Sequence, residues 1–360
     1  MSEAESGTIS GDRQNPFAGV LLGTAVGDAL GLPMEGISQR RQKRLFPGYL
    51  HHRFLFGKGM ISDDTEHTVM VAQALLECPS DAESFQLSLS RKFRWWLCTL
   101  PAGVGFATLK AILKLWLGFP ASKSGVWSAG NGPAMRSAIL GVYFADDSAR
   151  LRRFVRAGTR LTHLDPRAET AALAVAETAA WRSSQNSNID TLIAKLRSLS
   201  ETQEWSNILD QLKSSLSQQQ SVSFFASSLG LQNGVTGYCF HSVPVAIYSV
   251  LRHPQSFRTA VEEAIACGGD TDTVGAITGA LHAAADGPKA IPDEWRANIA
   301  DWPVSVSYLE RLAAQLTVSH QDELRKPRSC PVFWPATPVR NLFFLAVVLC
   351  HGLRRIFPPY

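Results

Sequence analysis

The sequence predicts an all-α fold, a single large multi-helix domain, on three observations. Apolar residues recur with a period near 3.6 along most of the 360 residues, and alternation with a period of two is nowhere sustained. Two stretches also repeat Gly and Ala at four-residue spacing, as in helices that pack closely against a neighbour. With 45% hydrophobic and 18% charged residues, the chain has the balance of a globular protein with a substantial core.

The two ends differ from the rest of the chain. Residues 1–15 predict a flexible polar tail, and they carry neither the basic start nor the apolar run of a secretory signal. We therefore expect a cytoplasmic protein, with the helical domain at 16–320 and a C-terminal extension at 321–360. The six cysteines show no CxxC spacing and indicate reduced thiols. The formal charge of +4 is too small to indicate nucleic-acid binding.

The first expected helix, 19–31, carries Gly19, Gly23, Gly27 and Gly31 every four residues. This spacing draws a smooth stripe down one helix face and predicts a buried, closely packed helix. Asp28 near its end argues against a membrane span. Glu35 follows in an irregular turn.

Further helices are expected almost without interruption after this point. The basic run 39–44 predicts a solvated surface turn. The helical pattern predicts elements at 83–100, 105–117, 133–144, 148–160, 166–181, 189–199, 205–216, 243–251, 256–267, 277–285 and 307–318.

An acidic cluster, Ser62-Asp63-Asp64-Thr65-Glu66, leads into a helix whose apolar positions keep the 3.6-residue period. Asp63 with Glu66 three residues later is a plausible capping-box variant, which would explain one carboxylate without any metal. It does not explain Asp64.

The second acidic cluster is Gly268-Gly269-Asp270-Thr271-Asp272-Thr273, just before the small-residue helix. Two carboxylates spaced i, i+2 converge only where the backbone turns or where a helix begins, and the two glycines permit that turn. The simpler interpretation is that one acid caps the helix.

Together the clusters supply four carboxylates and two hydroxyl groups. Such hard oxygen donors suit Mg²⁺ or Mn²⁺, and without cations the carboxylates would raise one another's pKa. A shared pair of divalent cations is therefore expected, provided the clusters meet in space. The residues concerned are Ser62, Asp63, Asp64, Asp270, Asp272 and Thr273.

These motifs resemble the ADP-ribosylglycohydrolases, the group that includes dinitrogenase reductase-activating glycohydrolase. The resemblance covers most of residues 16–290 and rests on the two acidic clusters, the helix ending in Gly27-Asp-Ala-Leu-Gly31, the loop 130–136 and the Thr162-His163 pair, in the family's order. Ser62 stands where the family usually has Thr, and a serine hydroxyl can still ligate a metal.

The resemblance implies an all-α fold, a binuclear Mg²⁺ or Mn²⁺ centre, and hydrolysis of the bond between ADP-ribose and a protein side chain or another acceptor. It implies metal binding by Ser62, Asp63, Asp64, Asp270, Asp272 and Thr273. From these roles we expect Asp63 or Glu35 to act as the catalytic base. The resemblance further implies substrate binding by the amides around Asn131 and Gly132, by His163 and by Tyr238, although His163 and Tyr238 could equally be structural.

Two other functions stay open from the sequence. The chain could be a non-catalytic, ADP-ribose-binding or structural member of the same fold, or a two-metal hydrolase acting on nucleotides or phosphoesters. The acceptor that carries ADP-ribose is not indicated by the motifs.

The extension contains an apolar run, 341–353, between Arg340 and Arg354. About thirteen residues between charges are fewer than the roughly 20 that cross a bilayer, so no transmembrane segment is expected. We expect a helix that packs on the main body or on another subunit. Peripheral membrane docking through the arginines is the alternative.

Overall fold

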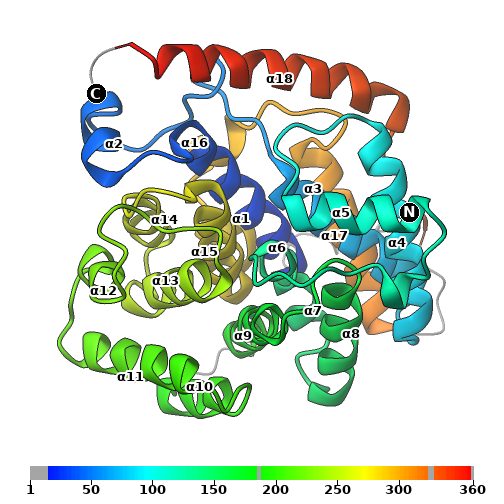
Figure 1. The fold of residues 1–360 in the computed structure, drawn as a ribbon, viewed down its shortest axis with the longest axis horizontal. Helices are drawn as coiled ribbons and strands as arrows, with labels where there is room; N and C mark the ends of the chain where they lie inside the picture. The colour runs from blue at the N-terminus through cyan, green and yellow to red at the C-terminus, as the bar shows by residue number, and fades with distance from the viewer. Residues whose placement is uncertain (1–14, 185–187, 323–327, 358–360) are drawn as a thin grey trace, which may run out of the picture.

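A computed structural model describes residues 15–184, 188–322 and 328–357. Within these ranges the regular structure is helical, with isolated β-bridges and no β-strand, which confirms the predicted all-α class. The helices, whose arrangement is shown in Figure 1, enclose one large hydrophobic core, and a small second cluster contains Phe54 and Phe344. The predicted tail at residues 1–15 lies almost wholly outside the described residues.

The first half of the chain forms the centre and one flank of the molecule. Its helices are α1 (Pro16–Gly31), α2 (Gln39–Leu45), α3 (Asp63–Glu77), α4 (Ala82–Cys98), α5 (Phe106–Trp116), α6 (Gly132–Met135), α7 (Ala138–Tyr143), α8 (Ser148–Arg160) and α9 (Pro166–Ser183), with 3-10 turns η2 (Leu32–Met34) and η3 (Ala121–Lys123).

The second half completes the core and adds the C-terminal helix. Its helices are α10 (Ile189–Arg197), α11 (Gln203–Ser217), α12 (Val222–Ser228), α13 (Cys239–Arg252), α14 (Phe257–Ile265), α15 (Thr271–Asp286), α16 (Asp293–Ala297), α17 (Val306–Gln321) and α18 (Thr337–Arg354), with 3-10 turns η4 (Gly287–Ala290) and η5 (Trp334–Ala336).

Helices α1 and α15 form the central pair of the molecule (Figure 1). The glycine stripe of α1 lies directly against the α15 backbone. A Cβ added at Gly27 would lie 2.0 Å from the Gly275 carbonyl oxygen, and one at Gly23 would lie 2.3 Å from that of Gly279. The glycines of both helices are therefore required for the same reason: the two backbones can approach this closely only where neither residue has a Cβ atom. The predicted close packing is confirmed.

Three predicted elements differ from the structure. The helix expected at 277–285 begins at Thr271, so the second acidic cluster is the first turn of α15. The helix expected at 133–144 is two helices, because the chain breaks at Arg136, whose buried guanidinium donates to the carbonyl of Gly158 and the hydroxyl of Thr162.

The basic run at 39–44 is a short helix, α2, where we expected a turn. The buried amide of Gln42 holds it to the body by donating to the Ile265 carbonyl at 3.0 Å. Its basic side chains do lie toward the outside, and Arg40, Lys43 and Arg44 are exposed.

The predicted C-terminal helix exists and is longer than its apolar run, since α18 spans 18 residues. It lies along one edge of the molecule (Figure 1). By length and composition alone, two segments could cross a membrane: Pro16–Met34, which is fully buried in the protein, and Trp334–Arg354, which is 22% buried. The first is a core helix, and the second is the largely exposed segment that contains α18.

Candidate active site

The starts of α3 and α15 meet at the candidate active site, where Asp64 and Thr273, 209 residues apart in sequence, are in contact. The Thr273 hydroxyl donates to Oδ2 of Asp64 at 3.2 Å, and the Ser62 hydroxyl donates to the same oxygen at 3.2 Å. The convergence of the two acidic clusters is therefore present in the structure. Asp64 and Thr273 are therefore far apart in sequence but in direct contact in the structure.

Ser62 is the N-cap of α3, and its hydroxyl oxygen accepts from the Asp64 amide at 3.3 Å. Asp63 and Asp64 lie in the first turn, where the partial positive charge of a helix start favours carboxylates. Asp270 is the N-cap residue of α15 without making a side-chain capping bond, which argues against the simple capping interpretation. Asp272 accepts from the Thr273 amide at 2.9 Å.

A sharp turn at Gly268 and Gly269, with φ of 71° and 81°, delivers the second cluster. A side chain at Gly269 would collide with Val235, because its Cβ would lie 1.9 Å from that carbonyl oxygen. The turn pairs on one side with Val235 and on the other with Ile37, two residues after Glu35. The predicted glycine turn therefore ties three loops of the site together.

Asp28 was not predicted as a site residue. Its carboxylate, fully buried in α1, accepts from the Ser62 amide at 2.9 Å and from the Thr65 hydroxyl at 2.5 Å. It thus holds the start of α3 in place. Burial raises the pKa of Asp28 to about 7. The signal in the sequence was a lone acid in an otherwise apolar, small-residue helix.

The clustered carboxylates have raised pKa values. Burial is the main cause for Asp63, Asp64, Asp270 and Asp272, and neighbouring carboxylates add to it for all of these except Asp270. Burial and Asp270 also raise the pKa of Glu35. A site that gathers this much unneutralised negative charge favours cations.

The donor set fits divalent cations of the magnesium type. It consists of carboxylate and hydroxyl oxygens, and Oδ1 of Asp64 is buried without a hydrogen-bond partner. Among the described residues, no group of three or more His, Cys, Asp or Glu is preformed as a metal cage. The fit to a metal therefore rests on the chemistry of the donors and on the unpaired Asp64 oxygen.

A cavity of about 510 Å³ opens over the acidic residues. Most of the predicted site residues line it: Glu35, Asp63, Asp64, Asn131, Gly132, His163, Asp270, Asp272 and Thr273. Ser62 lies beneath its wall and contacts Asp64. Phe106, Thr108 and Ser128 also line the cavity and were not predicted.

Asn131 contacts the acids directly. Its side-chain amide donates to Asp270 at 2.6 Å, and its backbone N–H donates to the Gly237 carbonyl at 3.0 Å. The expected cradle for a diphosphate therefore does not include the Asn131 backbone amide, which is already bonded. Gly132 lines the cavity beside it, and its role stays a prediction.

His163 lies on the cavity wall against Gly130 and Gly132, where a Cβ would meet its ring at 3.0 and 3.3 Å. Its Nδ1 pairs with the Thr162 hydroxyl at 2.9 Å. Burial, with Arg136 nearby, lowers the pKa of His163 to about 3, so its imidazole is neutral at physiological pH. It can exchange hydrogen bonds with a ligand without adding charge.

Tyr238 is not among the residues that line the cavity. Its hydroxyl donates to Glu204 at 2.7 Å, and the Arg167 guanidinium lies 5.7 Å from its ring centre. These contacts hold the ring beside the cavity loop that contains Gly237. Its predicted stacking on a ligand stays a prediction.

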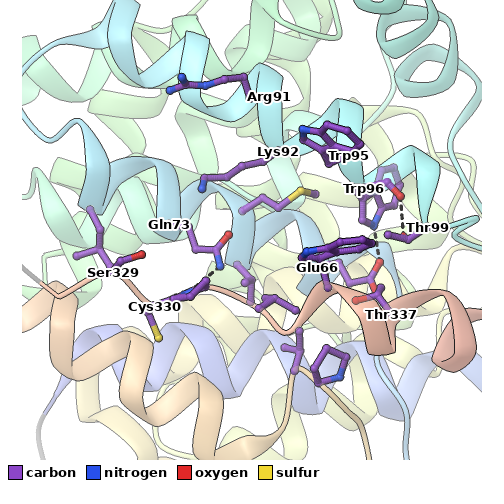
Figure 2. Close-up of a pocket in the computed structure, with 18 of the residues that line it drawn as sticks. Glu66, Gln73, Arg91, Lys92, Trp95, Trp96, Thr99, Ser329, Cys330 and Thr337 are labelled. Atoms are coloured by element: carbon purple, nitrogen blue, oxygen red, sulfur yellow. Dashed lines mark hydrogen bonds between the residues drawn. The ribbon is translucent and has the colours of Figure 1, made fainter.

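A second cavity, of about 1010 Å³, lies on the other side of α3, between α4 and the segment before α18 (Figure 2). Its acids are already paired. Glu66 accepts from Trp96 at 2.6 Å, Glu77 pairs with Lys92, and Asp301 pairs with Arg340. Its larger volume therefore does not make it the seat of the chemistry.

Comparisons with known proteins identify the family of the chain. The family model described as ADP-ribosylglycohydrolase matches residues 10–325. An uncharacterized protein of Archaeoglobus fulgidus is 31% identical over 85% of this chain and 97% of its own length. The ADP-ribosyl-[dinitrogen reductase] glycohydrolase of Rhodospirillum rubrum is 25% identical over 77% of this chain and 87% of its own.

Two further similarities cover most of the chain. The ADP-ribosylhydrolase ARH3 of Gallus gallus is 26% identical over 81% of this chain and 92% of its own. A solved structure titled ADP-ribosylglycohydrolase-related protein complex has a TM-score of 0.64 at 24% identity, over 86% of this chain and 99% of that one, which shows a shared fold.

Proposed function

Because the chain belongs to the ADP-ribosylglycohydrolase family, we propose that the acidic cavity hydrolyses the glycosidic bond between ADP-ribose and a protein side chain or another acceptor. The proposal includes two Mg²⁺ or Mn²⁺ ions. The observation that carries it is the contact of Asp64 with Thr273, which joins the two acidic motifs over a cavity large enough for a nucleotide sugar.

The cations would be held by Ser62, Asp63, Asp64, Asp270, Asp272 and Thr273. When bound, such ions supply Lewis acidity and lower the pKa of a water molecule that they hold. Support comes from the all-oxygen donor set and the unpaired Asp64 oxygen. Asp28 lies behind this set and fixes Ser62.

The protein groups divide the remaining tasks. Glu35 and Asp63, which both line the cavity, would take the proton from the attacking water. Burial and neighbouring carboxylates raise the pKa of both groups, and bound cations would lower both values. Neutral His163 and the polar side chains of the cavity wall would orient the ADP-ribose.

Asp270→Asn tests the proposal. The amide keeps the size of the side chain and removes its charge, so we expect metal affinity and the rate of ADP-ribose release to fall together, by roughly a hundredfold. Release is measured over a panel of arginine-, serine- and nucleobase-linked substrates in Mg²⁺ and in Mn²⁺. The matched control is Asp286→Asn, at the other end of α15, which should retain the wild-type rate.

A folded Asp270→Asn protein that releases ADP-ribose at the wild-type rate would contradict the proposal. Stabilisation by ADP-ribose and Mg²⁺ with no release from any substrate would instead indicate a binding protein. Release of inorganic phosphate or a nucleoside monophosphate would indicate a hydrolase of phosphoesters.

A further inference from the structure

Helix α18 presents an apolar face to the outside of the molecule. Leu342, Leu345, Leu349 and Leu353 follow one another at spacings of three or four residues and thus share one side of the helix. Their exposed fractions are 58%, 39%, 58% and 59%. A surface helix ordinarily carries polar residues at such positions, so this exposed apolar face indicates a binding surface.

The opposite face of α18 is fixed to the body by polar contacts. The Asn341 amide donates to the Thr99 carbonyl at 2.8 Å, and His351 pairs with the Phe54 carbonyl at 2.8 Å. Between them Phe344 is buried against Phe54. The helix therefore cannot turn its leucines inward without breaking these bonds, and they stay on the outside.

The two chain segments that contain α18 and α2 are basic in sequence. Residues 324–360 contain no Asp or Glu, and neither do residues 36–62, which include α2 and the loop that His351 contacts. The rest of the chain is consequently net negative, because the whole carries only +4. The exposed positive charges among the described residues of these segments are Arg40, Lys43, Arg44, Lys58, Arg328 and Arg354, whereas Arg340 is buried and paired with Asp301.

Exposed aromatic residues lie just before α18 and in the loop between α2 and α3. Phe333 and Trp334, just before α18, are 69% and 70% exposed. Tyr49 and Phe56, in the loop between α2 and α3, are 89% and 101% exposed. Aromatic rings of this kind are favourable at the level of lipid headgroups.

We propose that α18 docks on a membrane surface rich in anionic phospholipids, lying parallel to it with its leucines among the acyl chains and the basic residues of α2 near the headgroups. The positive charge of this surface favours an anionic membrane over a second copy of the chain as the binding partner, because pairing two such surfaces would bring like charges together. The polar anchors favour a parallel helix over a spanning one. The family model ends at residue 325, so α18 lies outside the part of the chain that the family shares.

Sedimentation of the full-length protein with vesicles tests this proposal. We expect binding to phosphatidylglycerol-containing vesicles, weaker binding to phosphatidylcholine alone, and release at high salt. The double variant Leu342→Glu with Leu349→Glu should lower the vesicle affinity by at least about tenfold, because two apolar contacts are lost and two negative charges gained. The matched control is Leu87→Glu with Leu117→Glu, at positions that are 56% and 78% exposed, on α4 and directly after α5.

A charge variant gives an independent readout. Arg40→Glu with Lys43→Glu should weaken binding to the anionic vesicles only. Each variant is checked by its thermal midpoint and by ADP-ribose release, which these surface changes should leave unaltered. Wild-type protein that stays in the supernatant with anionic vesicles overturns the proposal, as does a leucine variant that binds like the wild type. A dimer that the leucine variant makes monomeric, without vesicle binding, shows instead that a second copy covers this face.

Discussion

At the residue scale, the site depends on side chains that shape it without lying in the cavity. Asp28 accepts from the Ser62 and Thr65 amides and so sets where α3 begins. Arg355, just after α18, donates to the carbonyl of Pro33 at 2.9 Å and to that of Glu35 at 2.9 Å. The turn that carries Glu35 is therefore held by a residue from the far end of the chain.

Arg355→Ala should misplace Glu35 and lower kcat with a smaller effect on KM. Displacing a reacting group by about 1 Å costs roughly a hundredfold in rate, and we expect a loss of about tenfold or more. Arg355→Lys should recover part of it, because an ammonium can still donate to one of the two carbonyls. Steady-state kinetics with Arg354→Ala as the control gives the comparison. An unchanged kcat in Arg355→Ala would show that the contact does not position Glu35.

The sequence could indicate the two acidic clusters but not everything that holds them. Asp64 and Thr273 belong to recognisable motifs, and their contact follows from the packing of α1, α3 and α15. Arg355 belongs to no motif, and its role depends on where a helix outside the family's shared region comes to lie. Asn131 was expected to bind phosphate through its amide, yet Gly237 already occupies that group, a pairing between distant loops that local spacing does not encode.

At the scale of elements, the α1 and α15 pair should tolerate no added side chain. In Gly27→Ala the new Cβ would lie 2.0 Å from the Gly275 carbonyl oxygen, and because both partners are backbone, the helices must separate. We expect a loss of about 3 kcal/mol or more in the free energy of unfolding, or failure to fold. Gly158→Ala in α8 is the matched control, since its Cβ would meet nothing closer than 3.7 Å. There the higher helix propensity of Ala should stabilise by about 0.5–1 kcal/mol.

If Gly27→Ala unfolds in urea at the same concentration as the wild type, the close approach of α1 and α15 is wrong. Their pairing could be predicted from the repeated small residues, whereas the start of α15 could not. The helix begins at Thr271, so the acidic cluster itself forms its first turn. The 3.6-residue apolar pattern does not extend into this glycine-rich, acidic segment, and periodicity alone therefore does not locate the start of the helix.

The α15 helix also carries a pH-sensitive group away from the acids. Burial, with Arg182 nearby, lowers the pKa of His282 from 6.5 to about 4. The unfolded chain takes up this proton first as the pH falls, so the stability that neutral His282 contributes is complete above about pH 6.5 and is lost between there and pH 4. His282 contributes at most about 3 kcal/mol to the free energy of unfolding in this way.

His282→Gln should therefore flatten the fall in unfolding free energy between pH 7 and pH 4, measured by urea titration at each pH. Gln can still donate to the His253 carbonyl, which His282 contacts at 3.1 Å. The control His51→Gln changes an exposed ring and should leave the slope as it is. Equal slopes for wild type and His282→Gln would mean that this histidine is not neutral in the folded protein.

At the scale of the whole molecule, one ion-pair cluster joins the extension to the helical domain. Arg340 of α18 is 3% exposed, and its guanidinium donates to both carboxylate oxygens of Asp301 and to Glu66 of α3. The extension was expected to pack on the main body or on another subunit, and this cluster attaches it to the main body. Without the arginine, two buried carboxylates would lose their counter-charge.

Arg340→Met keeps much of the side-chain volume and removes the charge. Breaking a buried ion pair by deleting one partner costs about 3–5 kcal/mol, because the remaining charge stays buried and uncompensated. We expect that loss in the free energy of unfolding, with partial release of α18 detectable as faster amide exchange along residues 337–354. Arg197→Met is the control, since its pair with Asp210 is largely exposed and should contribute no more than about 1 kcal/mol. A loss as small as the control's would show that apolar contacts alone hold α18 to the domain.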